Sequence, residues 1–385
     1  MTTPAQLPVL WICGPSGVGK STVGWEFHRR LARAGIASGF VDIDQLGICY
    51  PEPAADPGRH RMQADNLGAM VAGFSDAGAR CLVVTGVVDA GRGVYADRMP
   101  GVALMVCRLR ADPETVGLRF LGRGSPAGLV EEVLRDAAAL DTSDFADTCV
   151  DTEGLPVAEV VRLVGERTGG WPGPGGLRPV RLPSPAAPVP APVPPPAHPV
   201  LWVCGATGVG KSAVGFEVYQ RLLGDGETAA YVDVEQLGLC DPAPAGDPGR
   251  HRLRARGLAA LWATYHRAAG ARRLVVTGPL EDEGDLSAYA EALPGARFTV
   301  CRLHAGPREL AARIARRGRG EGWNQPGDPL RGRPAARLRE IAGRAAASAA
   351  AMEAADLGDL RVDTDGRTVA EAADAVLAGA GARIP

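Results

Sequence analysis

The chain has 385 residues, of which 46% are hydrophobic and 22% are charged, and its formal net charge at pH 7 is −2. This length predicts two or three domains. The near-neutral balance argues against a general nucleic-acid or membrane-surface binder, because such proteins carry a basic excess. No apolar run approaches the ~20 residues that span a bilayer, and the N-terminal segment has no basic region. We therefore expect a cytoplasmic protein.

The first expected element is a buried strand over residues 9–13, followed by GPSGVGKST. This is the Walker A pattern G-x-x-x-x-G-K-[ST]. Its amides cradle phosphates, its lysine bridges the β- and γ-phosphates, and its hydroxyl residue binds Mg²⁺. A second copy, GATGVGKSA, holds the only other lysine of the chain. The predicted nucleotide-binding residues are Gly14, Pro15, Ser16, Gly17, Val18, Gly19, Lys20, Ser21 and Thr22, and Gly205, Ala206, Thr207, Gly208, Val209, Gly210, Lys211, Ser212 and Ala213. The predicted magnesium ligands are Ser21 and Ser212.

The second expected strand, over residues 40–43, has two carboxylates at its carboxyl end. A helix over residues 21–34 precedes this strand, with its N-terminus directed at the phosphates. Asp42 and Asp44 lie two residues apart in VDIDQLG, and the second copy has Asp233 and Glu235 in VDVEQLG. We expect one carboxylate to face a magnesium-bound water and the other to face a substrate hydroxyl. Capping of the next turn is the alternative role.

Arginines mark the helices that follow. The helix over residues 59–79 begins in DPGRHR, whose arginines could grip an anionic substrate or be solvated. The third strand, over residues 81–85, ends in Thr-Gly without the carboxylate of a Walker B segment. After the fourth strand (residues 103–109), Asp112, Pro113 and Glu114 start a helix. Arg119 and Arg123 lie on one face of this helix, and Arg313 and Arg317 match them in the second copy. We predict that these arginines are catalytic, and the alternative is that they lie on a solvated face.

A short fifth strand over residues 149–151 and a helix over residues 156–167 complete the first copy. Alternating strands and helices predict an α/β fold. Each copy is expected to be a doubly wound, five-stranded parallel sheet with its ligands at the carboxyl ends of the strands. Cysteines at positions 13, 107, 204 and 301 fall on expected core strands, so we expect buried, reduced thiols in a cytosolic protein.

The two halves are a tandem duplication. Lys20 and Lys211 are separated by 191 residues, and DPGRHR recurs at the same offset. We predict a first domain over residues 1–168, a proline-rich linker over residues 169–198 and a second domain over residues 199–385. About 18 extra residues lie between the fourth and fifth strands of the second copy, around residues 320–333. We expect the two copies to fold independently.

These motifs together resemble the small P-loop kinase family, which includes adenylylsulfate, gluconate, shikimate and nucleoside monophosphate kinases. VDIDQLG is similar to the D-G-D segment of adenylylsulfate kinases, with Ile43 in place of the glycine. DPGRHRMQADNLG occupies the position of that family's substrate-binding segment. The resemblance implies ATP and Mg²⁺ as cofactors and transfer of the γ-phosphoryl group to a small-molecule hydroxyl or phosphate, with Lys20 and Lys211 among the catalytic residues.

Two alternatives stay open at this point. One is a nucleotide-binding regulatory ATPase with vestigial catalysis, and the other is a nucleic-acid end kinase, against which the near-neutral charge argues. Between the copies, we expect the first to be the better catalyst, because it has the aspartate pair and the shorter segment after its fourth strand.

Overall fold

The computed structural model describes residues 6–173, 198–321 and 328–381. Two compact units make up the chain. Unit 1 comprises Met1–Gly47, Ala54–Ala191 and Gly238–Leu253, and unit 2 comprises Ile48–Pro53, Pro192–Leu237 and Arg254–Pro385. Most of the predicted linker lies outside the described residues, as does part of the insertion around residues 320–333. The described helices include none that could cross a membrane.

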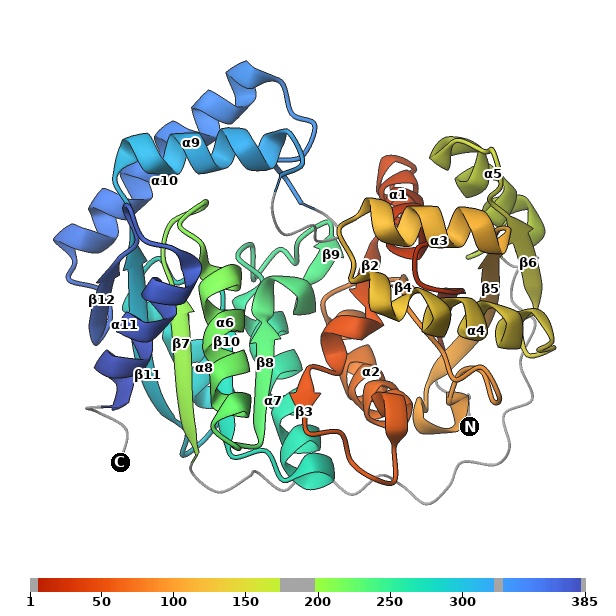
Figure 1. Cartoon of the computed structure of the whole chain (residues 1–385), viewed down its shortest axis with the longest axis horizontal. Coiled ribbons are helices and arrows are strands. Elements are labelled where there is room, and N and C mark those ends of the chain that lie inside the picture. Colours follow the sequence, from red (N-terminus) through yellow and green to blue (C-terminus); the bar gives the residue numbers. More distant parts are fainter. Residues whose placement is uncertain (1–5, 174–197, 322–327, 382–385) are drawn as a thin grey trace. The chain divides into compact units, whose positions relative to one another are not determined.

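Unit 1 is built on a six-stranded sheet with the order β6-β5-β1-β4-β2-β9 (Figure 1). The strands are β1 (Leu7–Cys13), β2 (Ser38–Asp42), β4 (Cys81–Thr85), β5 (Val102–Arg110), β6 (Thr148–Asp151) and β9 (Leu239–Asp241). The helices are α1 (Lys20–Arg33), α2 (His60–Asp76), α3 (Pro113–Gly122), α4 (Val130–Asp141) and α5 (Val157–Arg167). A short 3-10 helix, η1 (Ile43–Leu46), follows β2 directly.

Unit 2 has the same plan, with strand order β12-β11-β7-β10-β8-β3. Its strands are β3 (Cys49–Tyr50), β7 (Pro199–Cys204), β8 (Ala229–Asp233), β10 (Arg273–Thr277), β11 (Arg297–His304) and β12 (Leu360–Asp363). Its helices are α6 (Lys211–Gly224), α8 (Glu283–Ala292), α9 (Pro307–Gly318), α10 (Ala335–Ala354), α11 (Val369–Gly381) and α7 (His251–Ala269), whose first three residues belong to unit 1. Another 3-10 helix, η5 (Val234–Leu237), follows β8.

The prediction of five parallel strands is wrong by one strand in each sheet. Five strands of each sheet pair in parallel, and a short sixth strand pairs antiparallel at the edge. This sixth strand could not be predicted from local pattern, because it is only two residues long in β3 and three in β9. Strands this short carry almost no period-2 signal.

The sixth strand of each sheet comes from the other sequence repeat. Cys240 of β9 lies opposite Gly39 of β2, and Cys49 of β3 lies opposite Ala230 of β8. Both pairs of equivalent residues differ by the repeat offset (240 − 49 = 191 and 230 − 39 = 191). The repeats therefore exchange equivalent edge segments. The repeat boundaries 1–168 and 199–385 stay a prediction about the duplication, and the compact units differ from them by this exchange.

Apolar burial supports the exchanged strands. Leu239 of β9 packs against the core of unit 1, whereas Ile48 and Tyr50 pack against the core of unit 2. In each unit a glycine in the first helix lets that helix approach the sheet closely. A Cβ at Gly24 would lie 2.1 Å from Thr85 Cγ2. The cysteines predicted on core strands are fully buried, at positions 13, 107, 204 and 301.

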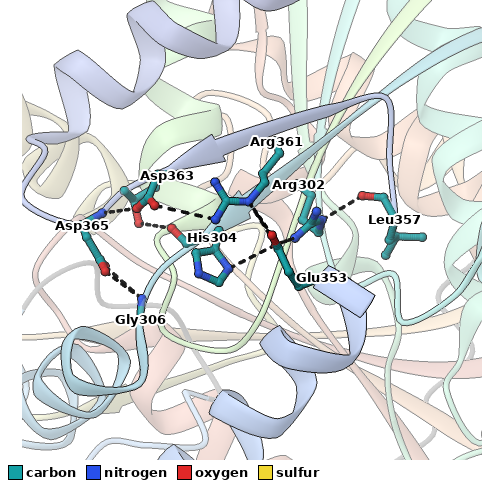
Figure 2. A network of polar contacts seen from close by, with 9 residues as sticks. Arg302, His304, Gly306, Glu353, Leu357, Arg361, Asp363 and Asp365 are labelled. Atoms are coloured by element: carbon teal, nitrogen blue, oxygen red, sulfur yellow. Dashed lines mark hydrogen bonds and ion pairs between the residues drawn. The ribbon is translucent and has the colours of Figure 1, made fainter. Parts of the chain in front are cut away.

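A buried arginine fixes the end of α10 to the sheet of unit 2 (Figure 2). Arg302 on β11 is only 2% exposed, and its Nε donates to the carbonyl of Leu357 at 2.9 Å. Its Nη1 donates to Glu353, which also accepts from Arg361 Nε at 3.0 Å. These two arginines lower the pKa of Glu353 to about 2. In unit 1 the equivalent residue of β5, Arg108, donates to the carbonyl of Leu140 at the end of α4.

A buried histidine lies where the first exchanged strand joins unit 1. His28 on α1 is 3% exposed, and its Nδ1 lies 2.9 Å from Ser38 Oγ, the residue opposite Asp241. Burial lowers the pKa of His28 to about 4; the charge of Asp241 opposes this shift and that of Arg250 adds to it.

We expect this histidine to make the protein acid-sensitive. Because the folded-state pKa of His28 is depressed below its unfolded value of 6.5, its contribution to stability is complete above pH 6.5. It is lost as the pH falls towards 4, and the loss amounts to about 3 kcal/mol. Urea unfolding at pH 7 and pH 4.5 measures how steeply the free energy of unfolding falls with pH, which we call the slope. His28→Gln is the matched variant. An identical slope in the two proteins would contradict the assignment.

Candidate functional site

The first predicted P-loop lies between β1 and α1, where its backbone encloses a lysine. Lys20 is 7% exposed, and its Nζ donates to the carbonyl of Pro15 at 3.0 Å. Gly14 has φ of +142°, and a Cβ there would lie 2.5 Å from the carbonyl oxygen of Leu109, so only glycine fits. The first amides of α1 lack partners within the helix and can bind an anion.

The second predicted P-loop has the same conformation between β7 and α6. The first, fourth and sixth residues of its motif have positive φ, as their counterparts do: Gly205 +134°, Gly208 +85° and Gly210 +106°. Lys211 Nζ donates to the carbonyls of Gly205 and Ala206 at 3.0 and 3.3 Å. The two loops are therefore equivalent in backbone and in the position of the lysine.

The first carboxylate of each predicted pair contacts the predicted magnesium serine. Ser21 Oγ donates to Asp42 Oδ2 at 3.0 Å, and Ser212 Oγ donates to Asp233 Oδ2 at 2.9 Å. The other oxygen of Asp42 accepts from the amide of Asp44 at 3.2 Å. Asp42 therefore caps the following turn and also reaches the P-loop. A hydroxyl beside a carboxylate is an all-oxygen donor set, which suits Mg²⁺.

Burial sets the electrostatics of this pair. Burial raises the pKa of Asp42 to about 7, and the charge of Asp44 adds to this shift. Burial also lowers the pKa of Lys20, while the charges of Asp44 and Asp42 oppose the shift. The charge of each of these two groups therefore favours the charged form of the other, against the effect of burial.

The second carboxylate of each pair is exposed at the carboxyl end of the sheet. A Cβ at Gly86 would lie 3.2 Å from Asp44 Oδ1, so the glycine after β4 leaves room for this carboxylate. Glu235 is also exposed, and its backbone N–H donates to Asp233 Oδ1 at 3.1 Å. The Thr-Gly end of β4 has no Walker B carboxylate, and its glycine leaves space for Asp44, which follows the neighbouring strand β2.

A cavity of about 410 Å³ in unit 2 brings the predicted residues together. It is lined by P-loop residues, by Glu235 and by three arginines of α9. The charged and hydroxyl residues that line it include Lys211, Ser212, Glu235, Arg313, Arg316 and Arg317. Arg316 was missed by the sequence analysis, although the consecutive arginines in RIARRG could have suggested it. A second cavity of about 430 Å³ also contains Arg313 and extends to Thr364 and Arg367.

The first arginine of each predicted pair is held by a threonine. Arg313 donates from Nη1 to Thr364 Oγ1 at 2.9 Å and to the carbonyl of Val209 at 2.8 Å. Arg119 donates to Thr152 Oγ1 at 3.0 Å and to the carbonyl of Thr152 at 3.2 Å. Both threonines end the VDT segments. Protein hydrogen bonds therefore fix these guanidinium groups, which sequence analysis expected to face a phosphoryl group.

The second arginine of each pair is placed differently in the two units. Arg317 lines the 410 Å³ cavity and pairs with Asp328 at 2.6 Å. Arg123 is exposed, donates to Ser125 Oγ at 3.1 Å and lies over the ring of Phe120. Arg317 therefore lies in a cavity with its P-loop, whereas Arg123 lies near enough to Lys20 for its charge to lower the pKa of that lysine.

The DPGRHR segments support the backbone. Asp56 accepts from the amides of Arg61 and Met62 at 3.0 and 2.9 Å, which caps the start of α2. Arg59 has a positive φ of 61°, and its Nη1 donates to the carbonyl of Gly47 at 2.6 Å. In the second copy Arg250 donates to the carbonyl of Cys240. Arg59 and Arg250 therefore each contact a backbone carbonyl, and the expected contact of the DPGRHR arginines with an anionic substrate stays a prediction.

Several solved structures match about half of the chain. No family model and no curated protein matches the chain. A tunicamycin resistance protein from Deinococcus radiodurans shares 19% identity over 48% of this chain and 96% of its own, with a TM-score of 0.32. A gluconokinase from Sinorhizobium meliloti shares 19% identity over 49% of this chain and 93% of its own, with a TM-score of 0.32.

A third match is an APS kinase from Mycobacterium tuberculosis, in complex with AMPPNP and APS. It shares 21% identity over 49% of this chain and 99% of its own, with a TM-score of 0.29. These neighbours include small-molecule kinases, and each spans about half of the chain.

Proposed function

We propose that each unit binds ATP with Mg²⁺ and that the chain transfers the γ-phosphoryl group to a small-molecule acceptor. The observation that carries this proposal is the pair of equivalent P-loops, each with a lysine inside it and a serine bonded to a buried aspartate. Both repeats keep this arrangement, although equivalent residues such as Phe40 and Tyr231 differ between them.

The chain's residues would divide the work as follows. The amides of each loop and the first turn of α1 or α6 bind phosphate oxygens. Lys20 or Lys211 neutralises them, and Ser21 with Asp42, or Ser212 with Asp233, would hold the metal. When bound, Mg²⁺ neutralises charge on the phosphates. The cavity of about 430 Å³ beside Thr364 and Arg367 would take the rest of the nucleotide.

The exposed carboxylates would act on the acceptor. Glu235 lines the same cavity as Lys211 and can accept the proton of an acceptor hydroxyl there. Asp44 occupies the equivalent position in unit 1. Arg316 and Arg317 give the cavity of unit 2 a cationic wall, which favours an anionic acceptor. All eight cysteines are free, which supports the proposed cytoplasmic location.

Calorimetric titration of the full chain with Mg·ATP tests the binding. We expect about two sites per chain, because each unit keeps the loop, the lysine and the serine–aspartate pair. Lys20→Ala and Lys211→Ala should each remove one site, since each lysine is the main cation of its loop. A stoichiometry of about one in the unsubstituted chain would exclude one unit, and absence of binding would exclude the proposal.

A nucleotide-binding regulator is the second candidate. It is favoured by the positions of Arg119 and Arg313, whose guanidinium groups are held by threonines and not directed freely at a transferred group. A screen for metabolites that stimulate ADP release separates the two functions. A stimulating acceptor supports the kinase, whereas slow turnover that no metabolite accelerates supports the regulator.

A further inference from the structure

The turn that carries the carboxylates of unit 1 runs directly into the strand that repeat one gives to unit 2. Three successive carbonyl groups, at residues 46–48, are held by hydrogen bonds. The first accepts from Asn66 Nδ2 at 2.7 Å and the second from Arg59 Nη1 at 2.6 Å, both within unit 1. The third accepts from the amide of Tyr231 at 2.9 Å, within unit 2. Each of these successive carbonyl groups is therefore held within its own unit.

Tyr231 connects this exchanged segment to the second P-loop. Its side chain is 1% exposed on β8, and its hydroxyl lies 2.9 Å from Thr277 Oγ1 and 3.4 Å from the carbonyl of Ser212. Burial, and secondarily the charge of Asp233, raises the pKa of the phenol, so it stays protonated. The Ser212 carbonyl can only accept from the Tyr231 hydroxyl, whereas either hydroxyl can be the donor between Tyr231 and Thr277.

Unit 1 lacks this connection. The residue equivalent to Tyr231 is Phe40 (231 − 191 = 40), which has no hydroxyl. Thr85, equivalent to Thr277, is fully buried, and its Oγ1 has no hydrogen-bond partner among the described residues. The chain therefore links the first repeat to the P-loop of unit 2 by a contact that unit 1 does not reciprocate.

We propose that Tyr231 is a positioning residue for Ser212, and that strand β3 of repeat one seats it, so that the nucleotide site of unit 2 depends on repeat one. This inference rests on the proposed function of Ser212 as a magnesium ligand. The hydrogen bond to the Ser212 carbonyl fixes the first turn of α6, which sets the direction of the Ser212 hydroxyl. Loss of one buried hydrogen bond of this kind corresponds to about a threefold to tenfold loss of affinity.

The test uses the full chain with Lys20→Ala, so that only unit 2 reports. Tyr231→Phe is expected to weaken Mg·ATP binding about threefold to tenfold, while affinity for ATP in excess EDTA changes less than about twofold. Phenylalanine is the natural residue at position 40, so the variant keeps the packing. Tyr289→Phe, at a fully buried tyrosine on α8, is the matched control and should leave both affinities unchanged.

A second pair of variants tests the seating by β3. Tyr50→Pro removes a backbone N–H from β3, the strand that pairs with β8. Asp241→Pro removes the equivalent N–H from β9, the strand that pairs with β2. In the Lys20→Ala chain, Tyr50→Pro should weaken Mg·ATP binding and Asp241→Pro should not. Circular dichroism confirms that each variant is folded.

The outcomes separate this inference from the proposed function. If the Lys20→Ala chain itself binds no Mg·ATP, the proposed function of unit 2 fails. If it binds and Tyr231→Phe binds as tightly, or loses equal affinity with and without Mg²⁺, the positioning role is wrong. If Asp241→Pro weakens binding and Tyr50→Pro does not, each edge strand supports its own repeat and the inference is overturned.

Discussion

Replacement of Asp44 by asparagine is expected to lower the turnover of unit 1 about 100-fold or more, the scale of losing a general base, while ATP affinity stays nearly unchanged. The reason lies in the two positions of the pair. Asp42 is buried on Ser21, whereas Asp44 is exposed where an acceptor can reach it. Single-turnover and steady-state rates with a stimulating acceptor, together with calorimetry, measure the two effects separately.

Matched variants assign the active unit. Asp42→Asn should also weaken the dependence on Mg²⁺, because it removes the carboxylate that accepts from Ser21. Glu235→Gln is the counterpart in unit 2, and we expect it to lower turnover less than Asp44→Asn does. Normal turnover in Asp44→Asn with an inactive Glu235→Gln would reverse the assignment. Normal turnover in both would remove the catalytic carboxylate and favour the regulator.

Cutting the linker is expected to leave the two halves associated. A protease site placed between residues 174 and 197 should yield two fragments that elute together in size exclusion and separate only in denaturant. Each fragment contributes a strand to the other's sheet, β3 in unit 2 and β9 in unit 1. This expectation replaces the sequence-based one, in which cutting released two independent domains. Separate elution of two folded fragments would contradict it.

A cysteine at position 230 decides which strand is paired there. Cys49 lies opposite Ala230 in the exchanged arrangement, and Cys240 would lie there if each repeat kept its own strand. In oxidised Ala230→Cys, exchanged strands allow a disulfide from residue 230 to Cys49, so the two cut fragments run as one band in a gel without reductant. Without exchange the disulfide forms with Cys240 inside one fragment, and two bands result. Ala229→Cys points to the opposite face and is the control, since it should not join Cys49.

Local chemistry explains why the conformation of the two glycine-rich loops was predictable. Glycines 14 and 205 require positive φ, and the lysine two residues before the end of each motif is enclosed by carbonyls of its own loop. All of this is encoded within nine residues. The carboxylate pair was predictable for the same reason, because its position at the end of β2 or β8 follows from one short strand and one turn.

The exchanged strands were not predictable, because both repeats offer nearly the same edge. VDIDQLG and VDVEQLG lead into strands that would have the same register on either sheet. Only long-range packing, such as Leu239 against the core of unit 1, selects between them. The protein contacts of Arg59 and Arg119 were not predictable for a related reason. A sequence pattern gives no sign that a backbone carbonyl or a threonine will contact an arginine, and the expected roles of Arg59 and Arg119 at a ligand stay predictions.

The reciprocal exchange also sets an order on the ribosome. The edge strand that unit 1 needs lies 191 residues beyond the equivalent residue of repeat one (241 − 50 = 191). At bacterial or eukaryotic elongation rates this is a delay of about 10 to 40 s. During that interval β2 has an unpaired edge and β3 has no sheet to join. Nascent chains stalled inside repeat two therefore expose the unpaired edge of β2, which can pair with a neighbouring nascent chain on the same polysome. We expect chaperone binding to nascent chains to peak at these lengths.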